Sequence, residues 1–350
     1  MSFKVLAELK FDLLQEIGHE GKNSNVWTAD EKQFDAIIAV KKIQKKDFVD
    51  FNEYYLEAKK LYSSEHQNVV QVKYACEDLE NIYIAMPFYK NGSIKKLINS
   101  RFLTVREIIR YATQFLSGVH NIHVKDLIHF DIKPDNILLS NNNEALISDF
   151  GLANRVDSFG FSNISKAYYK HLPPEYFTQS AHTMLYDIYN AGLTLYRMCN
   201  GENFLNNQIS QFTSDEEFKN AILAGSFPDR KAFLPHIPKK LQKVIVKALN
   251  IEQGLRHQSV LELVNEISVV DELLDWKYVE TITEKSWSKQ YSDKIFVVNL
   301  VVSAGIGQIT TRKTMLASSN TTVVREHSCR NIELRKAEKT VQDILLKIEK

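Results

Sequence analysis

One eight-residue segment, HFDIKPDN at 129–136, constrains this chain more than any other. The proline and the aspartate in its second half interrupt helix and strand, so we predict a loop. The apolar residues 137–139 follow at once and predict a short buried strand that holds the loop rigidly. Asp131, Lys133 and Asn136 put a carboxylate, an ammonium group and an amide on this loop. A carboxylate base, a cation and a metal-binding amide together suit the transfer of a phosphoryl group to a hydroxyl.

The segment resembles the catalytic loop of the protein kinase family, which runs H-R-D-L-x-x-x-N. A second motif, Asp149-Phe150-Gly151, begins 13 residues after Asn136, across a predicted hairpin, and matches the family's metal-binding D-F-G. The resemblance implies that Asp131 is the catalytic base and that Lys133 stabilises charge on the transferring phosphoryl group. It also implies that Asn136 and Asp149 hold Mg²⁺, a hard cation that prefers oxygen ligands.

The resemblance covers about residues 11–267, roughly three quarters of the chain, and implies an α+β, two-lobed protein-kinase-like fold. Residues 1–89 are then a small β-rich N-lobe, and residues 90–274 a larger helical C-lobe. Apolar side chains recur every three or four residues from 104 to 124, which predicts a long helix in the C-lobe. A small basic domain with β-β-β-α order, residues 275–350, is appended to this fold.

The family assigns ATP binding to a glycine-rich turn, the strand after it, a helix, the connector between the lobes and the strand after the catalytic loop. In this sequence the matching residues are Gly18, Gly21, Val26, Ala39, Lys41, Glu57, Met86, Pro87, Tyr89 and Leu138. The turn departs from the family pattern, because Ser24 replaces its third glycine and Gly18 is displaced by one residue. Lys41 matches the lysine that contacts the α- and β-phosphates. A buried ammonium needs a partner, and Glu57 matches that partner better than Glu53, which stays an alternative.

Two more matches concern the support of the catalytic loop. Pro173-Pro174-Glu175 stands where the family has A-P-E, and Arg256 lies where its arginine partner belongs. Asp187 resembles the aspartate of D-x-W-S-x-G, which braces the catalytic loop. Because these matches are far apart in sequence and in the right order, we expect Glu175 and Arg256 to form a buried pair.

Two departures bear on mechanism. The resemblance places the activation segment at residues 152–172. Phe130 replaces the arginine of H-R-D, which usually pairs with a phosphorylated residue of the activation segment, and an aromatic ring cannot accept a phosphate in this way. We therefore hypothesise that activity does not require phosphorylation of the activation segment. Tyr168 replaces the threonine with which serine/threonine kinases usually touch the catalytic loop. Lys133 favours serine/threonine specificity, and dual specificity stays open.

Composition limits the other function classes. The chain has 350 residues, is 44% hydrophobic and carries a formal net charge of +1, which argues against global attraction to nucleic acid or membrane. Its longest apolar run, 295–307, contains Asn299 and is too short to cross a bilayer. The N-terminus lacks the apolar core of a signal peptide, and three widely spaced cysteines suit a reducing compartment. We predict a cytoplasmic protein without a membrane partner.

The C-terminal stretch has a different composition. Residues 285–350 contain 12 Lys and Arg against six Asp and Glu, a net charge of +6, so residues 1–284 carry −5. Strands are predicted at 295–302, 308–315 and 322–327, and an amphipathic helix at 334–348. Three interpretations stay open: a packing or dimerisation domain that binds a second copy, a site for an acidic partner, and an RNA-binding module.

The sequence therefore predicts an ATP-dependent protein kinase that phosphorylates Ser and Thr hydroxyls of protein substrates, with Mg²⁺ or, alternatively, Mn²⁺. The alternative is a pseudokinase that acts as a scaffold or as a regulatory nucleotide-binding protein. The usual mark of a pseudokinase is the loss of residues equivalent to Lys41, Asp131 or Asp149, and none is lost here. A phosphotransferase for small molecules fits less well, because Glu175, Asp187 and Arg256 match the platform for protein substrates.

Overall fold

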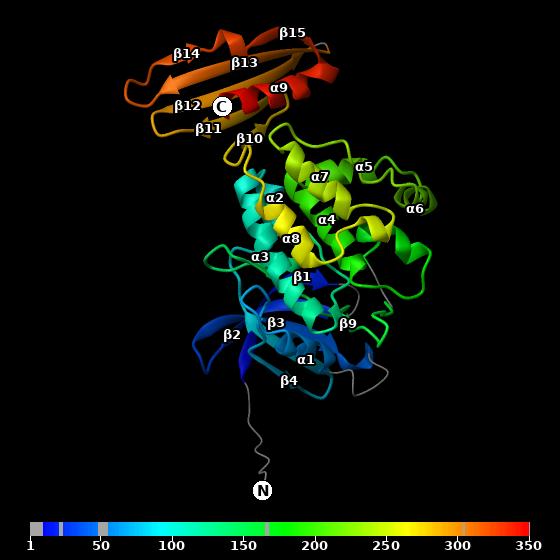
Figure 1. Ribbon diagram of the computed structural model, residues 1–350. Coiled ribbons are helices and arrows are strands. Elements are labelled where there is room, and N and C mark those ends of the chain that lie inside the picture. The colour runs from blue at the N-terminus through cyan, green and yellow to red at the C-terminus, as the bar shows by residue number, and fades with distance from the viewer. Residues whose placement is uncertain (1–9, 21–23, 48–54, 165–167, 304, 350) are drawn as a thin grey trace.

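The computed structural model describes residues 10–20, 24–47, 55–164, 168–303 and 305–349. The chain forms three parts in succession: a β-sheet near the N-terminus, a helical region in the middle and a second β-sheet with a helix at the C-terminus (Figure 1). The first two parts correspond to the two lobes that the kinase resemblance implies. The active-site motifs lie in both of them.

The N-terminal sheet is antiparallel, with strand order β1-β2-β3-β5-β4. Helix α1 (Leu56–Ser63) lies between the third and fourth strands along the chain. A hairpin turn at 78–80 joins the last two strands of this sheet along the chain. The strands are β1 (Phe11–Glu20), β2 (Ser24–Glu31), β3 (Ala36–Gln44), β4 (Tyr74–Glu77) and β5 (Asn81–Pro87).

The helical region is built around α3 (Val105–Val124), which confirms the helix predicted from apolar spacing. Thr104 and Glu107 form a reciprocal capping box at its start, and this fixes where the helix begins. Its apolar face is buried against the neighbouring helices. The remaining helices are α2 (Ile94–Ser100), α4 (Leu185–Asn200), α5 (Glu202–Ile209), α6 (Asp215–Leu223), α7 (Lys239–Ala248) and α8 (Val260–Ser268).

Two small strand pairs hold the loops that carry the motifs. Strand β7 (Ile137–Leu139) pairs with β8 (Ala145–Ile147), which confirms the hairpin between the catalytic loop and D-F-G. Strand β6 (Leu127–Ile128) pairs with β9 (Asn154–Arg155) and ties the start of the catalytic loop to the activation segment. Short 3-10 turns lie at Lys45–Asp47, Pro134–Asn136, Tyr169–His171, Pro174–Phe177, Gln253–Leu255 and Arg325–His327.

The C-terminal sheet contains the expected strands and helix and is larger than expected. The prediction of a strand over 322–327 is wrong in its second half, where the chain turns at Arg325–His327. Two strands before residue 294 and one after residue 328 enlarge the sheet to six strands. The elements are β10 (Lys277–Glu280), β11 (Glu284–Gln290), β12 (Lys294–Ser303), β13 (Ile306–Met315), β14 (Thr321–Val323), β15 (Cys329–Glu333) and α9 (Leu334–Glu349).

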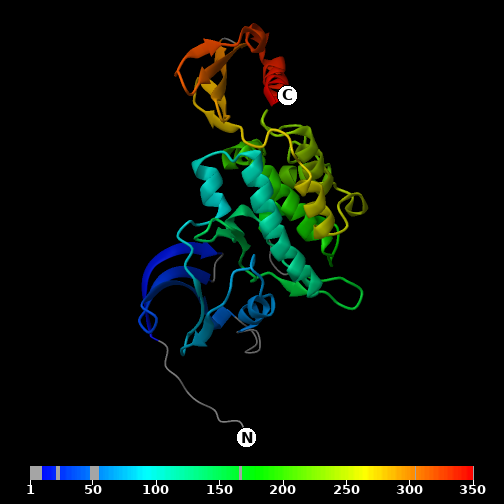
Figure 2. The same ribbon diagram turned by 60° about the vertical axis from the view of Figure 1, so that its left-hand side comes forward.

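Helix α9 covers one face of this sheet (Figure 2). On the covered face, a Cβ added to Gly307 of β13 would lie 3.0 Å from Ile332 Cγ2, 3.2 Å from Leu300 Cδ1 and 3.4 Å from Ala337 Cβ. A side chain at 307 would therefore press on Ile332 and Leu300, whereas its distance to Ala337 of α9 is an ordinary van der Waals contact.

The C-terminal sheet also packs against the helical region. The Tyr278 ring lies 4.6 Å from the Phe102 ring and 5.5 Å from the His236 ring, and on its other side 5.0 Å from the Trp287 ring. Gln342 on α9 donates to the carbonyl oxygens of Pro235 and Ile237 at 3.2 and 3.0 Å. The two regions thus share one apolar core.

No helix within the described ranges is both long and apolar enough to cross a membrane.

Candidate active site

The catalytic loop brings three predicted groups together at one carboxylate. Asp131 is 95% buried, and its Oδ2 accepts from Lys133 Nζ at 2.7 Å and from Asn136 Nδ2 at 2.8 Å. Asn136 Nδ2 also donates to the carbonyl oxygen of Asp131 at 2.9 Å. The 3-10 turn over Pro134–Asn136 makes this possible, because it bends the chain back toward Asp131. The carboxylate, the ammonium group and the amide therefore form one cluster.

Asp187 braces the catalytic loop through hydrogen bonds to its backbone, as the resemblance implies. It lies on α4 and is fully buried. Its carboxylate accepts from the backbone N–H groups of His129 and Phe130 at 2.8 and 2.9 Å, and contacts His123 Nε2 at 2.8 Å. Phe130 has a positive φ of 66°, which costs a bulky residue roughly 1–2 kcal/mol. These bonds hold the strained backbone in place.

Asp149 is brought to the catalytic loop by the β7–β8 hairpin. Both the backbone N–H and the Oγ of Ser148 donate to the carbonyl oxygen of Asn136, at 2.8 and 3.0 Å. Asp149 follows with φ of 59°, and its Oδ1 accepts from Lys41 Nζ at 2.8 Å. This ion pair joins residues 108 positions apart and links the N-terminal sheet to the helical region.

The predicted nucleotide-binding residues of the N-terminal sheet share one face. Cross-strand partners place Gly18, Val26 and Lys41 in one row and Ala39 and Met86 in the next row. Alternate residues of a strand point to the same side, so these rows belong to the face from which Lys41 reaches Asp149.

The other predicted residues of this group fall into two sets. Pro87 ends β5, Tyr89 follows it, and Leu138 forms a backbone bridge with Ser93. All three are half-buried. Gly21 lies outside the described residues, as does the alternative partner Glu53. Glu57 falls within α1, but its side chain is outside the described part, so the predicted contact with Lys41 stays a prediction.

Burial and nearby charges shift the pKa values of Asp131 and Asp149 in opposite directions. Burial raises the pKa of Asp131 and the Asp149 charge raises it further, whereas the Lys133 ammonium opposes the rise. At Asp149 burial acts in the same direction, but the Lys41 ammonium prevails and holds the pKa well below its usual range. Asp131 is therefore the better proton acceptor, and Asp149 stays ionised as a metal ligand must.

The residues present fit a magnesium ion that is shared with phosphate groups. Because the Asn136 amide nitrogen is used by Asp131, its oxygen is left as a ligand beside the ionised Asp149. Mg²⁺ usually takes one or two protein carboxylates together with phosphates and water. Within the described chain, no group of three or more His, Cys, Asp or Glu side chains is placed to hold a metal ion.

The activation segment contacts Phe130 through apolar side chains. Phe130 is 99% buried with Ile128 and Tyr186, and Leu152, Val156 and Ile164 of the segment pack on this cluster. Its ring meets those of Tyr186 and His182 edge-on, at centroid distances of 5.1 and 6.2 Å.

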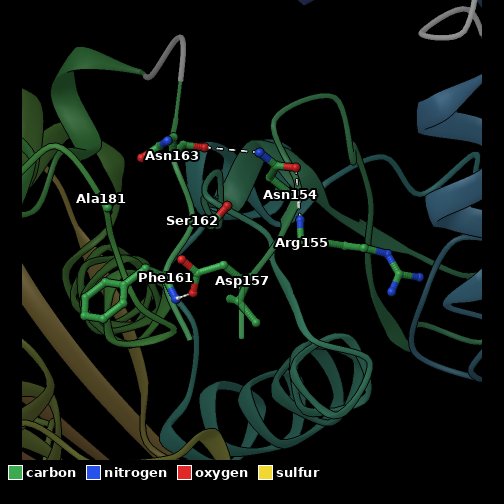
Figure 3. Close-up of a pocket in the computed structure, with 8 residues that line it drawn as sticks. Asn154, Arg155, Asp157, Phe161, Ser162, Asn163 and Ala181 are labelled. Atoms are coloured by element: carbon green, nitrogen blue, oxygen red, sulfur yellow. Dashed lines mark hydrogen bonds between the residues drawn. The ribbon is translucent and has the colours of Figure 1, made fainter. Parts of the chain in front are cut away.

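The outer part of the activation segment folds back on itself (Figure 3). Asp157 Oδ1 accepts from the N–H groups of Phe159 and Phe161, both at 2.9 Å, and Ser162 exchanges two backbone bonds of 2.8 Å with His182. A cavity of about 340 Å³ is lined by residues 154–157, 161–163 and Ala181, and none of the predicted site residues lines it. The described segment is thus ordered by its own hydrogen bonds and by the apolar cluster around Phe130.

The predicted pair of Glu175 and Arg256 is present and almost fully buried. Arg256 Nη1 and Nη2 donate to the two carboxylate oxygens of Glu175, each at 2.7 Å, and Arg256 Nε donates to the carbonyl oxygen of Asn250. The pair joins the end of the activation segment to the turn before α8.

Sequence reasoning missed a second buried cation, Arg197 on α4. It donates to Glu202 at 2.9 and 2.7 Å, to Asp135 of the catalytic loop at 3.4 Å and to His171 Nε2 at 3.0 Å. The sequence feature that could have indicated this residue is an arginine within a mostly apolar helical stretch. Such a residue needs a buried partner, but spacing alone does not say which one.

Comparison with known proteins agrees with this geometry. The family described as "Protein kinase domain" matches residues 11–279. The probable serine/threonine-protein kinase PknB of Lactococcus lactis is 25% identical over 272 residues, 76% of this chain and 42% of that protein. PrkC of Bacillus subtilis, also named a serine/threonine-protein kinase, is 25% identical over 263 residues, 73% of this chain and 39% of its own length.

A third relative, the probable serine/threonine-protein kinase samkA of Dictyostelium discoideum, is 33% identical over 181 residues, 48% of this chain and 27% of that protein. The matched part is less than half the length of each of these relatives. The family match nevertheless covers most of the chain and contains the whole cluster around Asp131. The chain belongs to the protein kinase family.

Proposed function

We propose that this protein is an active, ATP-dependent protein kinase that phosphorylates Ser and Thr hydroxyls. The observation that carries the proposal is the cluster in which Asp131 receives both Lys133 and Asn136. The ion pair between Lys41 and Asp149 brings the nucleotide-binding face to the same point. We assign the activity to residues 1–274, with an N-lobe at 1–89 and a C-lobe at 90–274.

In the proposed reaction the substrate hydroxyl lies against Asp131. Its proton passes to the Asp131 carboxylate while its oxygen forms a bond to the γ-phosphorus, and the bond to the β,γ-bridging oxygen breaks, with ADP keeping the electron pair. Lys133 stabilises charge on the transferring group, and Lys41 positions the phosphates. Asn136 and Asp149 hold Mg²⁺, or Mn²⁺ in its place, which neutralises phosphate charge when bound.

Adenine would lie against the face that carries Val26 and Ala39, with Met86 behind it. Backbone groups near Pro87 and Tyr89 would bind the adenine edge. Pro87 has no amide hydrogen, so it can only accept a hydrogen bond, through its carbonyl oxygen. Gly18 and Gly21 would lie over the phosphates, and Leu138 below the base. Glu57 would support Lys41.

We also propose that activity does not require phosphorylation of the activation segment. The apolar cluster of Phe130 with Leu152, Val156 and Ile164 supports it, because it supplies the contact that a phosphate–arginine pair makes elsewhere in the family. The test replaces Ser158, Ser162 and Ser165 with alanine and Tyr168 and Tyr169 with phenylalanine. We expect activity within threefold of wild type. Loss of activity in a variant that still folds and binds ATP would refute this part.

The competing proposal is a pseudokinase that binds nucleotide and acts as a scaffold. Purified protein with labelled ATP and generic acceptors, beside Asp131→Ala, separates the two. An enzyme should lose at least about a hundredfold in phosphoryl transfer when its base is removed. Asp343→Ala is the control, because it removes an exposed carboxylate on α9. Equal signals from wild type and Asp131→Ala would refute the enzyme.

For residues 275–350 we favour a packing role over RNA binding. Tyr278, Trp287 and Phe296, on the three successive strands β10, β11 and β12, lie on the face that α9 covers. The opposite face carries rows such as Ser286, Asn299 and Thr310, whereas single-stranded RNA is usually held by exposed aromatic rings.

Binding assays with the full chain test this preference. Salt-dependent binding of duplex or single-stranded RNA would overturn it, and so would capture of an acidic polypeptide such as poly-glutamate. Sedimentation would report a dimer if a second copy is the partner. We also propose a cytoplasmic location, because Cys76, Cys199 and Cys329 are free thiols.

A further inference from the structure

Tyr168 lies directly against the proposed catalytic lysine. The Lys133 ammonium is 4.7 Å from the centre of the Tyr168 ring, over its face. The same ammonium donates to Asp131 Oδ2 at 2.7 Å. Lys133 thus has a carboxylate on one side and an aromatic face on another, and its side chain is only 17% exposed.

Tyr168 is joined to a buried residue. The backbone N–H of His171 donates to the carbonyl oxygen of Tyr168 at 2.9 Å, the two ring centres lie 6.4 Å apart, and His171 is 98% buried. Arginine can only donate, so the 3.0 Å contact with Arg197 makes His171 Nε2 the acceptor and leaves the ring proton on Nδ1. Arg197 is in turn bound by Glu202 through two hydrogen bonds. The position of Tyr168 is therefore tied to α4, the helix that also carries Asp187.

An aromatic ring can attract a cation without forming a hydrogen bond to it, which a hydroxyl group cannot do. The ring quadrupole attracts the ammonium without using any of its three N–H donors. One of these donors is used by Asp131, which leaves two N–H groups for the oxygens of the transferring phosphoryl group. A threonine at this position would compete for the ammonium or for the carboxylate with its own hydrogen bonds.

We propose that Tyr168 is the positioning residue of Lys133, and that its ring holds the ammonium beside Asp131 for phosphoryl transfer. The inference deepens the proposed function and rests on it. It predicts that the aromatic face matters and the phenol hydroxyl does not. It also predicts that Tyr168 acts only through Lys133.

Steady-state kinetics test the first prediction. Tyr168→Leu should lower kcat about tenfold and leave the KM for ATP within twofold, because Lys41 and Asp149 are untouched. Tyr168→Phe should restore kcat to within about twofold of wild type. Tyr169→Phe is the control, since the neighbouring tyrosine donates to the carbonyl oxygen of Asp215 and lies away from Lys133. Equal losses in the Leu and Phe variants of Tyr168 would refute the role of the ring.

A double-mutant cycle tests the second prediction. In a Lys133→Met background, Tyr168→Leu should change kcat by less than twofold. A further tenfold loss would mean that Tyr168 acts by another route, for example as a wall of the substrate site, and would overturn the inference. Thermal unfolding of each variant separates these effects from a loss of folded protein.

A spectroscopic measurement tests the contact without turnover. In protein labelled with ¹³C at lysine Cε, the Lys133 signal is identified by its absence in Lys133→Met. The ring above it should shift this signal upfield in wild type and in Tyr168→Phe, and the shift should vanish in Tyr168→Leu. An unshifted wild-type signal would refute the contact. A wild-type chain without phosphoryl transfer would refute the proposed function as well, whereas an active chain with an unaffected Tyr168→Leu variant would refute this inference alone.

Discussion

Charged side chains are used in opposite ways in the catalytic region and in the C-terminal sheet. Near the catalytic loop they are buried and paired with each other: the side chains of Arg256 and Glu175 are 0% and 3% exposed. In the C-terminal sheet domain, pairs such as Lys336 and Glu333 are 71% exposed on both sides. The interior there is apolar instead, with Trp287 and Leu345 fully buried.

The difference separates a region built for chemistry from a region built for packing. Burying an ion pair costs desolvation energy that an apolar contact does not, so such pairs contribute geometry more than stability. Asp187 and Arg197 fix the catalytic loop at that cost.

Among its described residues, the C-terminal domain has one largely buried pair, Lys289 and Glu349, whose side chains are 14% and 17% exposed. This pair lies where the domain meets the helical region, because Glu349 also accepts from the Leu273 N–H. The two buried polar side chains of the described domain, Thr311 and Gln342, bond to backbone carbonyl groups.

The largest predicted effect comes from breaking the buried ion pair. Arg256→Met leaves Glu175 buried without a partner, which should lower the free energy of unfolding by about 3–5 kcal/mol. Urea denaturation measures it. Adding Glu175→Leu should recover a good part of the loss, because no charge is then left buried. If the double variant is less stable than Arg256→Met, the pair does not behave as a desolvated charge pair.

The next effect concerns the contact between the two regions. Tyr278→Ala removes three ring contacts at a buried site and should cost about 3 kcal/mol. Val279→Ala is the matched control, because this neighbour on β10 is 59% exposed and should change stability by less than about 0.5 kcal/mol. Circular dichroism and kinase activity during the same denaturant titration should change together. An early transition with full activity would mean that the C-terminal domain folds and unfolds alone.

A smaller effect is expected at Phe130. Phe130→Leu keeps an apolar side chain but loses the edge-on contacts with Tyr186 and His182, which should cost about 1–1.5 kcal/mol. Phe159→Leu in the same segment is the control, since that ring is 85% exposed. Equal destabilisation of the two variants would contradict the apolar anchoring of the activation segment. The two variants are compared by the urea concentration at the unfolding midpoint, with the dependence of the free energy of unfolding on urea concentration unchanged.

The sequence predicted those parts of the fold that depend on neighbours in the chain. Helix α3 was found because its apolar spacing and Thr104 cap are local features. Strand β11 was missed because its sequence, EKSWSKQ, has Trp287 as its one large apolar residue and otherwise resembles a surface loop. The turn at Arg325–His327 cut short a predicted strand, since nothing in the local pattern excluded an extended chain there.

The active site was predictable for a different reason. Asp131, Lys133 and Asn136 lie within six positions, so their convergence follows from one tight turn. Lys41 and Asp149 lie 108 positions apart; the family resemblance assigned both to the nucleotide and metal site, but the ion pair between them was not predicted, since the expected partner of Lys41 was Glu57. Arg197 was missed because its partners Asp135, His171 and Glu202 meet only in the folded chain.

The smallest predicted effect is a shift in pH dependence, and it identifies the base. Burial raises the pKa of Asp131, and the Lys133 ammonium partly offsets that rise. The carboxylate must be deprotonated to accept the substrate proton, so kcat/KM should fall as the pH drops through this pKa. Lys133→Met removes the offsetting charge, so the pKa rises further and the acid limb should move to higher pH. Asp149 cannot cause this limb, because Lys41 holds its pKa well below the usual range.

Labelled ATP makes the residual rate of Lys133→Met measurable across the pH range. Lys243→Met, which removes an exposed lysine on α7, controls for a general change in net charge and should leave the limb in place. A limb that stays put or moves to lower pH in Lys133→Met would mean that a group other than Asp131 takes the proton. The buried charges around the catalytic loop would then serve to fix its geometry and not to tune the base.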